Sequence, residues 1–251
     1  MSLTDKLVRH QIFLERFAGS VSRTMQQGIN QARDIAIQAF IATGQVDVDL
    51  DRVETEIRAV LQASMDQALN NIKELNQYEG EFAARTLRAE VEQEIEEAAN
   101  DILEAALLNK AMPVGTADKK TNRKIEPSYN KLAEENTKLF MSQVKEADRG
   151  EDALATAGGI AALAAGLLRF RAQSLSRASV VHASNTAKDE TYKVNKDVVD
   201  KVEWVSVLDS RTTDFCRNQD NKRYPVGQGP RPPAHYNCRS ITKPVVKGID
   251  E

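Results

Sequence analysis

Apolar residues recur every three or four positions along most of the chain, and this spacing constrains the fold more than any other feature. The spacing places apolar side chains on one face of an α-helix. The first stretch of this kind runs from Leu14 to Phe40 and predicts one long helix. Its apolar positions are Leu14, Phe17, Val21, Met25, Ile29, Ala32, Ile35 and Ala39.

A second helix is expected after an acidic interruption. Gly44 and the stretch from Asp47 to Asp51 break the apolar pattern. Asp49 or Asp51 suits the N-cap of a new helix, because its carboxylate can accept from unpaired backbone N–H groups. The apolar residues of this helix run from Val53 to Leu75.

A third helix is predicted after a break near Gly80. It runs from Leu87 to Leu103, extends towards Met112, and includes an acidic, solvated face between Glu90 and Glu104. Residues 1–112 are therefore expected to form an antiparallel bundle or a hairpin arm of long helices.

Residues 113–127 are the best candidate for a linker, since they combine turn formers, a basic run and two prolines. A helical segment follows over residues 128–192. It begins with a short helix from Ser128 to Glu146 and ends with a polar helix from Arg169 to Tyr192.

Between these two helices, the 16 residues from Ala153 to Leu168 carry no charge. The run is shorter than the roughly 20 apolar residues of a membrane-spanning helix. Two interpretations remain open: a buried helix whose small residues allow close packing, or a segment that enters a membrane or packs in an oligomer. The flanking Asp152 and Arg169 favour the buried helix.

The chain changes character after residue 192. Apolar and polar residues alternate from Val202 to Asp209, around Trp204, and this pattern predicts a strand. Prolines and glycines then predict a small irregular α+β module over residues 193–251, with two or three short strands and a Cys/His cluster. The expected fold class is therefore mainly α, with long antiparallel helices followed by this module.

Composition agrees with a helical body. Charged residues make up 28% of the chain and aromatic residues only 5%, which favours long, thin helical elements over a thick core. The net charge of −3 indicates neither a dedicated nucleic-acid binder nor a strong anion mimic. The N-terminus shows no signal peptide, and two cysteines do not make a secreted disulfide scaffold, so the host cytoplasm is the expected compartment of synthesis.

The polar residues of the module follow a recognisable order, in the stretches "DSRTTDFC" (209–216) and "PPAHYNCRS" (232–240). With Trp204 upstream, this order resembles the phage Mu F-type head morphogenesis family, the minor head proteins of tailed phages. The resemblance covers roughly the last third of the chain. The matching residues are Trp204, Asp209, Arg211, Thr212, Cys216, Tyr224, Pro232, Pro233, His235, Asn237, Cys238 and Arg239.

The resemblance implies a structural minor head protein in the virion. Such a protein associates with the portal and acts in head assembly and in genome packaging or ejection, and we expect several copies per particle. Two alternatives stay open: a zinc-dependent nuclease or hydrolase, and a membrane-active ejection protein that uses residues 153–168. No general base and no catalytic motif is evident, so we assign no catalytic or cofactor-binding residue.

The family often has cysteines where this chain has Thr213 and Ser240, and a four-sulfur metal site is therefore excluded. Cys216, His235 and Cys238 remain as candidate metal ligands, with Asp209 as a candidate fourth, and together they form the kind of tetrahedral set that zinc prefers. The alternatives are buried thiols that act as small apolar groups, with His235 bonded to a loop carbonyl. A Cys216–Cys238 disulfide is conceivable but does not suit cytoplasmic assembly.

The other motif residues are expected to act in structure. Arginine forks match carboxylates, so we expect Asp209, Arg211 and Arg239 to hold loops together, with Asp214 as another acceptor for Arg239. From residue 209 to residue 247, eight Lys or Arg face three Asp, which makes packaged DNA a further candidate partner. The eight are Arg211, Arg217, Lys222, Arg223, Arg231, Arg239, Lys243 and Lys247.

Overall fold

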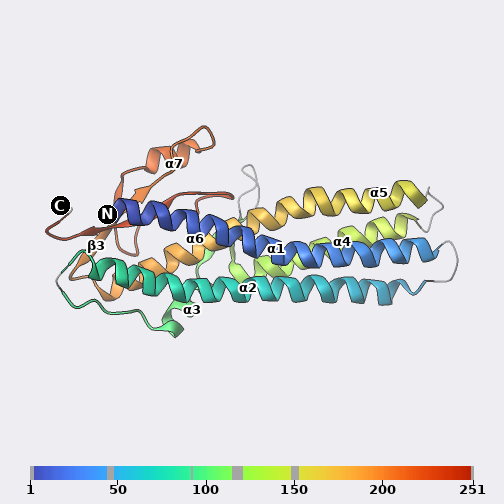
Figure 1. The fold of residues 1–251 in the computed structure, drawn as a ribbon, viewed down its shortest axis with the longest axis horizontal. Helices are drawn as coiled ribbons and strands as arrows, with labels where there is room; N and C mark the ends of the chain where they lie inside the picture. Colours follow the sequence, from blue (N-terminus) through green and yellow to red (C-terminus); the bar gives the residue numbers. More distant parts are fainter. Residues whose placement is uncertain (1–2, 44–47, 92, 115–120, 148–152, 250–251) are drawn as a thin grey trace. The chain divides into compact units, whose positions relative to one another are not determined.

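The structure is a computed structural model that describes residues 3–43, 48–91, 93–114, 121–147 and 153–249. Long helices dominate it, and a small three-stranded sheet lies near the C-terminus, which confirms the predicted fold class (Figure 1). The helices are α1 (Leu3–Thr43), α2 (Leu50–Arg88), α3 (Asn100–Asn109), α4 (Ile125–Ala147), α5 (Ala153–Leu163), the π-helical η1 (Ala164–Leu168), α6 (Arg169–Val194) and α7 (Asp214–Gln219). The strands are β1 (Ala111–Val114), β2 (Thr121–Lys124), β3 (Val199–Val205), β4 (Arg223–Pro225) and β5 (Ile241–Val246).

The chain divides into two compact units that do not follow chain order. Unit 1 comprises Met1–Ala18, Asn71–Ile125 and Arg177–Glu251, and unit 2 comprises Gly19–Asn70 and Glu126–Ser176. The long helices α1, α2 and α6 each contribute to both units.

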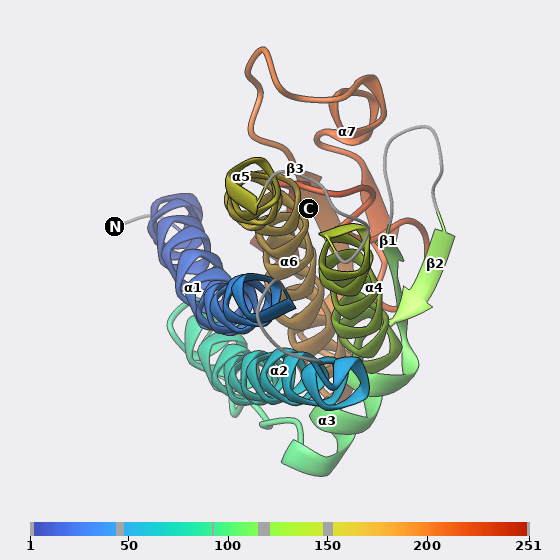
Figure 2. The same cartoon turned by 90° about the vertical axis from the view of Figure 1, so that its right-hand side faces the viewer.

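Unit 2 is built from helices that run side by side, as both ribbon views show for parts of α1, α2, α4 and α5 (Figure 2). Each of these helices buries residues at the predicted steps of three and four. The buried apolar residues include Val21, Met25, Ile29, Ile57, Leu61, Met65, Phe140, Met141, Val144, Ile160 and Ala164.

The start of α2 follows the predicted cap. The Arg52 N–H donates to Oδ1 of Asp49 at 3.0 Å, so Asp49 rather than Asp51 supplies the capping carboxylate. Gly44, the other expected feature of this break, lies outside the described residues.

The uncharged run at 153–168 forms α5 and η1, and only part of its surface is covered. Ile160, Ala164 and Leu168 are buried, whereas Ala162, Ala165 and Leu167 are exposed. The expected close packing of small residues therefore applies to one stripe, because α5 packs through a single face. Among the described residues, no helix is long and apolar enough to cross a membrane.

Unit 1 contains the three-stranded sheet, in the order β4-β3-β5 with both pairs antiparallel. The second half of α6 packs within this unit and is almost entirely buried. Tyr192 of α6 joins Val199 and Val202 of β3 and Val246 of β5 in one apolar cluster with Leu87 of α2. This half of helix α6 is therefore a central, buried element of unit 1, although its sequence is polar.

The predicted break near Gly80 is wrong, since α2 continues unbroken to Arg88. A Cβ at position 80 would lie 2.6 Å from Cδ1 of Leu103. Glycine is therefore present to allow α3 to approach α2 closely, and not to end the helix.

The predicted third helix is also wrong over most of its length. Residues 93–99 are not helical, and only α3 keeps part of the expected range. Asn195 accepts from the Glu96 N–H and donates to the Glu96 carbonyl, both at 2.9 Å, while Arg88 donates to the Ile95 carbonyl at 3.0 Å. These tertiary hydrogen bonds replace the helical ones, and Ile95 is buried although its segment is not helical.

Residues assigned to the linker form an antiparallel pair, in which β1 from 111 to 114 faces β2 from 121 to 124. Residues 125–127 of the predicted linker already belong to α4, and residues 115–120 lie outside the described residues. The strand predicted at 202–209 is confirmed for its first half, because β3 runs from Val199 to Val205.

Candidate metal centre

The candidate site is built on the end of β3 and on α7. Trp204 is 1% exposed and packs with Cys216, Cys238 and Ala234. Its indole N–H donates to the Ser206 hydroxyl at 2.8 Å, and that hydroxyl donates to the Cys216 carbonyl at 2.9 Å. The tryptophan therefore fixes the short helix that carries the first cysteine.

A tight turn presents the other two residues of the set. The Cys238 N–H donates to the His235 carbonyl at 3.2 Å, and Asn237 within this turn has a φ of 57°. Asparagine tolerates this left-handed conformation better than most residues. The turn brings both the imidazole of His235 and the thiol of Cys238 towards α7.

Three candidate ligands come together. The Sγ of Cys216 lies 3.1 Å from Nε2 of His235 and 3.8 Å from Sγ of Cys238, and all three ligand atoms lie within 4.8 Å of one another. Nδ1 of His235 is 2.7 Å from the Tyr236 carbonyl, which can only accept. This contact places a proton on Nδ1 and leaves Nε2 directed at the two sulfurs.

The two thiols differ in acidity. The pKa of Cys216 falls to about 4, chiefly because Cys238 hydrogen-bonds to its sulfur, against the opposing effect of burial. The same contact with Cys216, together with burial, raises the pKa of Cys238. Cys216 is therefore the more acidic thiol of the pair, and a thiolate is the form that binds metal.

The donor set fits zinc. With Zn–S bonds of about 2.3 Å, two thiolates of a tetrahedral site lie about 3.8 Å apart, as Cys216 and Cys238 do. An imidazole whose second nitrogen donates to a backbone carbonyl is the usual partner of such thiolates. Thr213 stands where the family has cysteine, and its hydroxyl lies 3.0 Å from Nε2 of His235.

Asp209 does not join the set. Arg239 donates to both of its carboxylate oxygens at 2.6 Å, and the Arg211 N–H adds a third bond at 2.8 Å. The bond from Arg239, with the contact from Arg211, lowers the pKa of Asp209 well below its usual range. The carboxylate therefore closes the loop between Asp209 and Arg239 and is not available as a fourth ligand.

Other motif residues also act in structure. Thr212 accepts from the Asp209 N–H at 3.0 Å and donates to the Val207 carbonyl, which shapes the loop before α7. Pro233 is buried beside the turn, and Asn237 accepts from Arg177 of α6 at 3.1 Å.

The comparisons with known proteins agree with this geometry. The family model described as Phage Mu protein F like protein matches residues 107–243, more than half of the chain. The chain belongs to this family. The comparison with curated proteins found no match, and neither did the comparison with solved structures.

Membership makes the chain a phage head morphogenesis protein, as the motif in the last third predicted. The family match also extends beyond that third, since it begins in α3 and includes α4 and α6. The matched residues of this Mu F-like protein therefore contain both the candidate metal ligands and helix α6.

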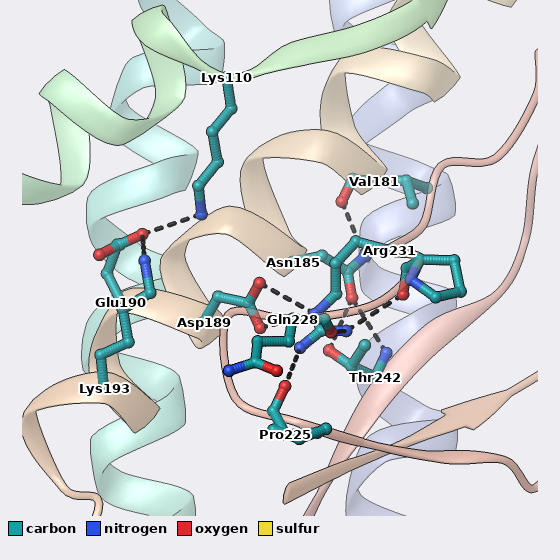
Figure 3. Close-up of polar contacts among 11 residues, drawn as sticks. Lys110, Val181, Asn185, Asp189, Glu190, Lys193, Pro225, Gln228, Arg231 and Thr242 are labelled. Atoms are coloured by element: carbon teal, nitrogen blue, oxygen red, sulfur yellow. Dashed lines mark hydrogen bonds and ion pairs between the residues drawn. The ribbon is translucent and has the colours of Figure 1, made fainter.

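In this Mu F-like protein, α6 anchors the loop that carries the site, through residues that sequence reasoning missed (Figure 3). Arg231 donates through Nε to both oxygens of Asp189 at 3.0 Å, and its remaining donors reach the carbonyls of Pro225, Gln228 and Pro230. Asp189 is 4% exposed. One arginine therefore ties the loop after β4 to the helix.

A second anchor fastens β5. Oδ1 of Asn185 accepts from the N–H of Thr242 at 2.9 Å and from its hydroxyl at 2.8 Å, while Nδ2 donates to the Val181 carbonyl (Figure 3). Nearby, Glu190 accepts from Lys110 and Lys193 at 2.8 and 2.7 Å. The only sequence signal for these anchors was the run of polar residues in α6.

A small pocket opens beside the cluster. It is lined by Val207, Arg211, Thr212, Thr213, Cys216, His235, Asn237, Arg239 and Ser240. This lining contains no Asp or Glu that could serve as a general base beside a bound metal.

Proposed function

We propose that this head morphogenesis protein is a structural minor head protein that associates with the portal during assembly and serves genome packaging or ejection. One observation carries the structural role: the residues that sequence reasoning selected bind one another. Arg239 is committed to Asp209, and Cys216 to His235 and Cys238. These side chains stabilise the C-terminal module, and the long helices remain available to bind partners.

Zinc would complete this closure. Cys216, Cys238 and Nε2 of His235 would hold it, with Thr213 or a water at the fourth position. The metal would supply a cross-link between α7 and the turn at 235–238. A module with so small a core gains stability from such a link.

Packaged DNA is the other proposed partner. Four of the eight basic residues between 209 and 247 are paired with acids, namely Arg211 and Arg239 with Asp209, Arg223 with Glu203 and Arg231 with Asp189. Arg211, Arg217 and Lys222 are exposed. These three would contact phosphates without reading sequence.

Portal association is tested by co-expression with the portal protein encoded by the same phage. We expect a tagged copy of this chain to retain the portal through size-exclusion chromatography, and we expect the chain in purified procapsids. Procapsids that form without the chain, together with no retained portal, would overturn the proposal.

Zinc binding is tested by metal analysis of the full chain. We expect about one zinc per chain, and loss of metal with a lower thermal midpoint in the Cys216→Ser, Cys238→Ser variant. Lys222→Ala, an exposed change in the same module, serves as the control. A metal-free protein whose midpoint does not respond to added zinc would reject the metal and leave the portal result unaffected.

A further inference from the structure

Unit 1 exposes an aromatic cluster outside the candidate site. The chain has only 13 Phe, Tyr and Trp residues, and four of them, Phe13, Phe17, Tyr78 and Phe82, gather where α1 lies against α2. The ring of Phe13 lies 5.5 Å from that of Tyr78 and 6.0 Å from that of Phe17. So much aromatic surface in an aromatic-poor chain needs an explanation.

The cluster is open to solvent. Phe13 is 38% exposed, Tyr78 is 40% exposed, and the adjacent Ile12 is 49% exposed. Contiguous exposed apolar surface with aromatic residues at its centre is typical of protein interfaces, because burying it provides much of the binding energy. We call Phe13, Phe17, Tyr78 and Phe82 the aromatic seam.

Charges of opposite sign flank the seam on its two helices. The exposed charged residues beside it include Arg9 and Arg16 on α1, and Glu74 and Glu81 on α2. None of these four forms an ion pair with another residue that the structure describes. The α1 side of the seam therefore carries two arginines, and the α2 side carries two glutamates together with Arg85, whose guanidinium lies 5.8 Å from the centre of the Phe82 ring.

The two charged pairs have the same spacing. Seven residues separate the arginines and seven separate the glutamates, so each pair spans about 10 Å along its helix. The stacking of His10 on Phe82 at 3.6 Å sets the register of the antiparallel helices. This register places Arg9 level with Glu81 and Arg16 level with Glu74.

We propose that the aromatic seam binds a second copy of this chain around a two-fold axis parallel to α1 and α2. Such an axis places α1 of each copy over α2 of the other, so the arginines of one copy face the glutamates of its partner at both ends of the seam. A two-fold axis perpendicular to the helices would instead oppose like charges. The surface is thus self-complementary, as an isologous interface requires.

Sedimentation velocity on the full chain tests self-association from about 1 to 200 µM. We expect the mass to rise from 27.8 kDa towards twice that value, and the dimer to weaken as salt increases. One double variant carries Arg9→Glu and Arg16→Glu, and the other carries Glu74→Arg and Glu81→Arg. Each double variant creates repulsion between copies at both ends of the seam. Each double variant on its own should self-associate with an affinity at least about tenfold lower than that of the wild-type chain.

Mixing the two variants provides the decisive test. In the mixture every glutamate on α1 of one variant faces an arginine on α2 of the other, so a heterodimer should form with roughly wild-type affinity. The control is a double variant with Arg23→Glu and Lys145→Glu, which makes an equal charge change at exposed positions in unit 2. It should leave self-association unchanged.

Two outcomes would overturn the proposal. One is a wild-type chain that stays monomeric at every concentration. The other is a mixture that remains as monomeric as its separate components. Loss of portal binding in both variants without any self-association would instead assign the seam to the portal.

Discussion

At the scale of single residues, the module depends on a few buried polar contacts that join distant parts of the chain. Asp189 and Arg231 are the clearest case, since their side chains are 5% and 16% exposed and Arg231 makes every other bond to backbone carbonyls. Removing one partner of a buried pair leaves an uncompensated charge.

Asp189→Ala should therefore lower the free energy of unfolding by about 3–5 kcal/mol, measured by urea denaturation. It should also release the loop that carries His235 and Cys238, so both thiols should react faster with a disulfide reagent. Asp66→Ala removes an exposed carboxylate with one hydrogen bond and should change neither quantity. Equal stability losses in the two variants would contradict this account of the loop.

At the scale of elements, the helices of unit 2 differ in how closely they pack. A Cβ at Gly28 of α1 would lie 2.5 Å from Cβ of Ser64 on α2, so this crossing requires glycine. A Cβ at Gly158 of α5 would meet nothing within 4 Å. The same substitution should therefore act in opposite directions at the two positions.

Gly28→Ala should destabilise the protein by about 1–3 kcal/mol, because the two helices must separate. Gly158→Ala should stabilise it by about 0.5–1 kcal/mol, because alanine lowers the conformational entropy of the unfolded chain and favours the helix. Thermal unfolding followed by circular dichroism measures both. A Gly28→Ala protein as stable as wild type would show that this contact is looser than described.

At the scale of the whole molecule, buried titratable groups predict acid sensitivity. His182 lies within α6, and burial lowers its pKa to about 4, with a smaller contribution from Lys110 and an opposing contact with the Leu107 carbonyl. Burial alone would raise the pKa of Glu79, but Lys188, His10 and Ser184 together lower it. Both groups bind protons more readily in the unfolded chain.

Stability should therefore fall as the pH drops from about 6.5 to about 4, and His182 alone should account for about 3 kcal/mol of the loss. The sign follows because the folded pKa lies below the unfolded one, so acid favours the unfolded state. His182→Gln keeps a donor for the Leu107 carbonyl and should flatten this part of the pH profile. Urea midpoints measured at several pH values test it, and parallel profiles would contradict the assignment.

Local patterns were sufficient for much of the fold. Periodic apolar residues predicted α1 and most of α2, and Asp49 was one of two predicted caps for α2. Helices were also predicted over most of α4 and α6. The order of residues from Trp204 to Arg239 indicated the family, because a loop motif of this kind consists of residues that lie close together in the sequence. Residue types suggested that Arg239 pairs with an acid, and left Asp209 and Asp214 as the two candidates.

Long-range contacts decided the rest. Gly80 suggested a helix break, but it lies inside α2 against Leu103. Residues 93–99 have helical spacing but are not helical, and Asn195 binds the backbone of Glu96 instead. The same limit applied to the site, since the anchors Asn185 and Asp189 lie far in sequence from Thr242 and Arg231.

The sequence by itself determined that this protein is mainly helical, that it ends in a small module with clustered cysteine and histidine, and that it resembles a phage head family. Only the tertiary structure decided that the polar helix α6 is buried, that Asp209 is committed to Arg239, and that aromatic rings from α1 and α2 share one surface. The physical reason is range: helix propensity and turn chemistry act between neighbouring residues, whereas burial depends on partners that the fold brings from elsewhere in the chain.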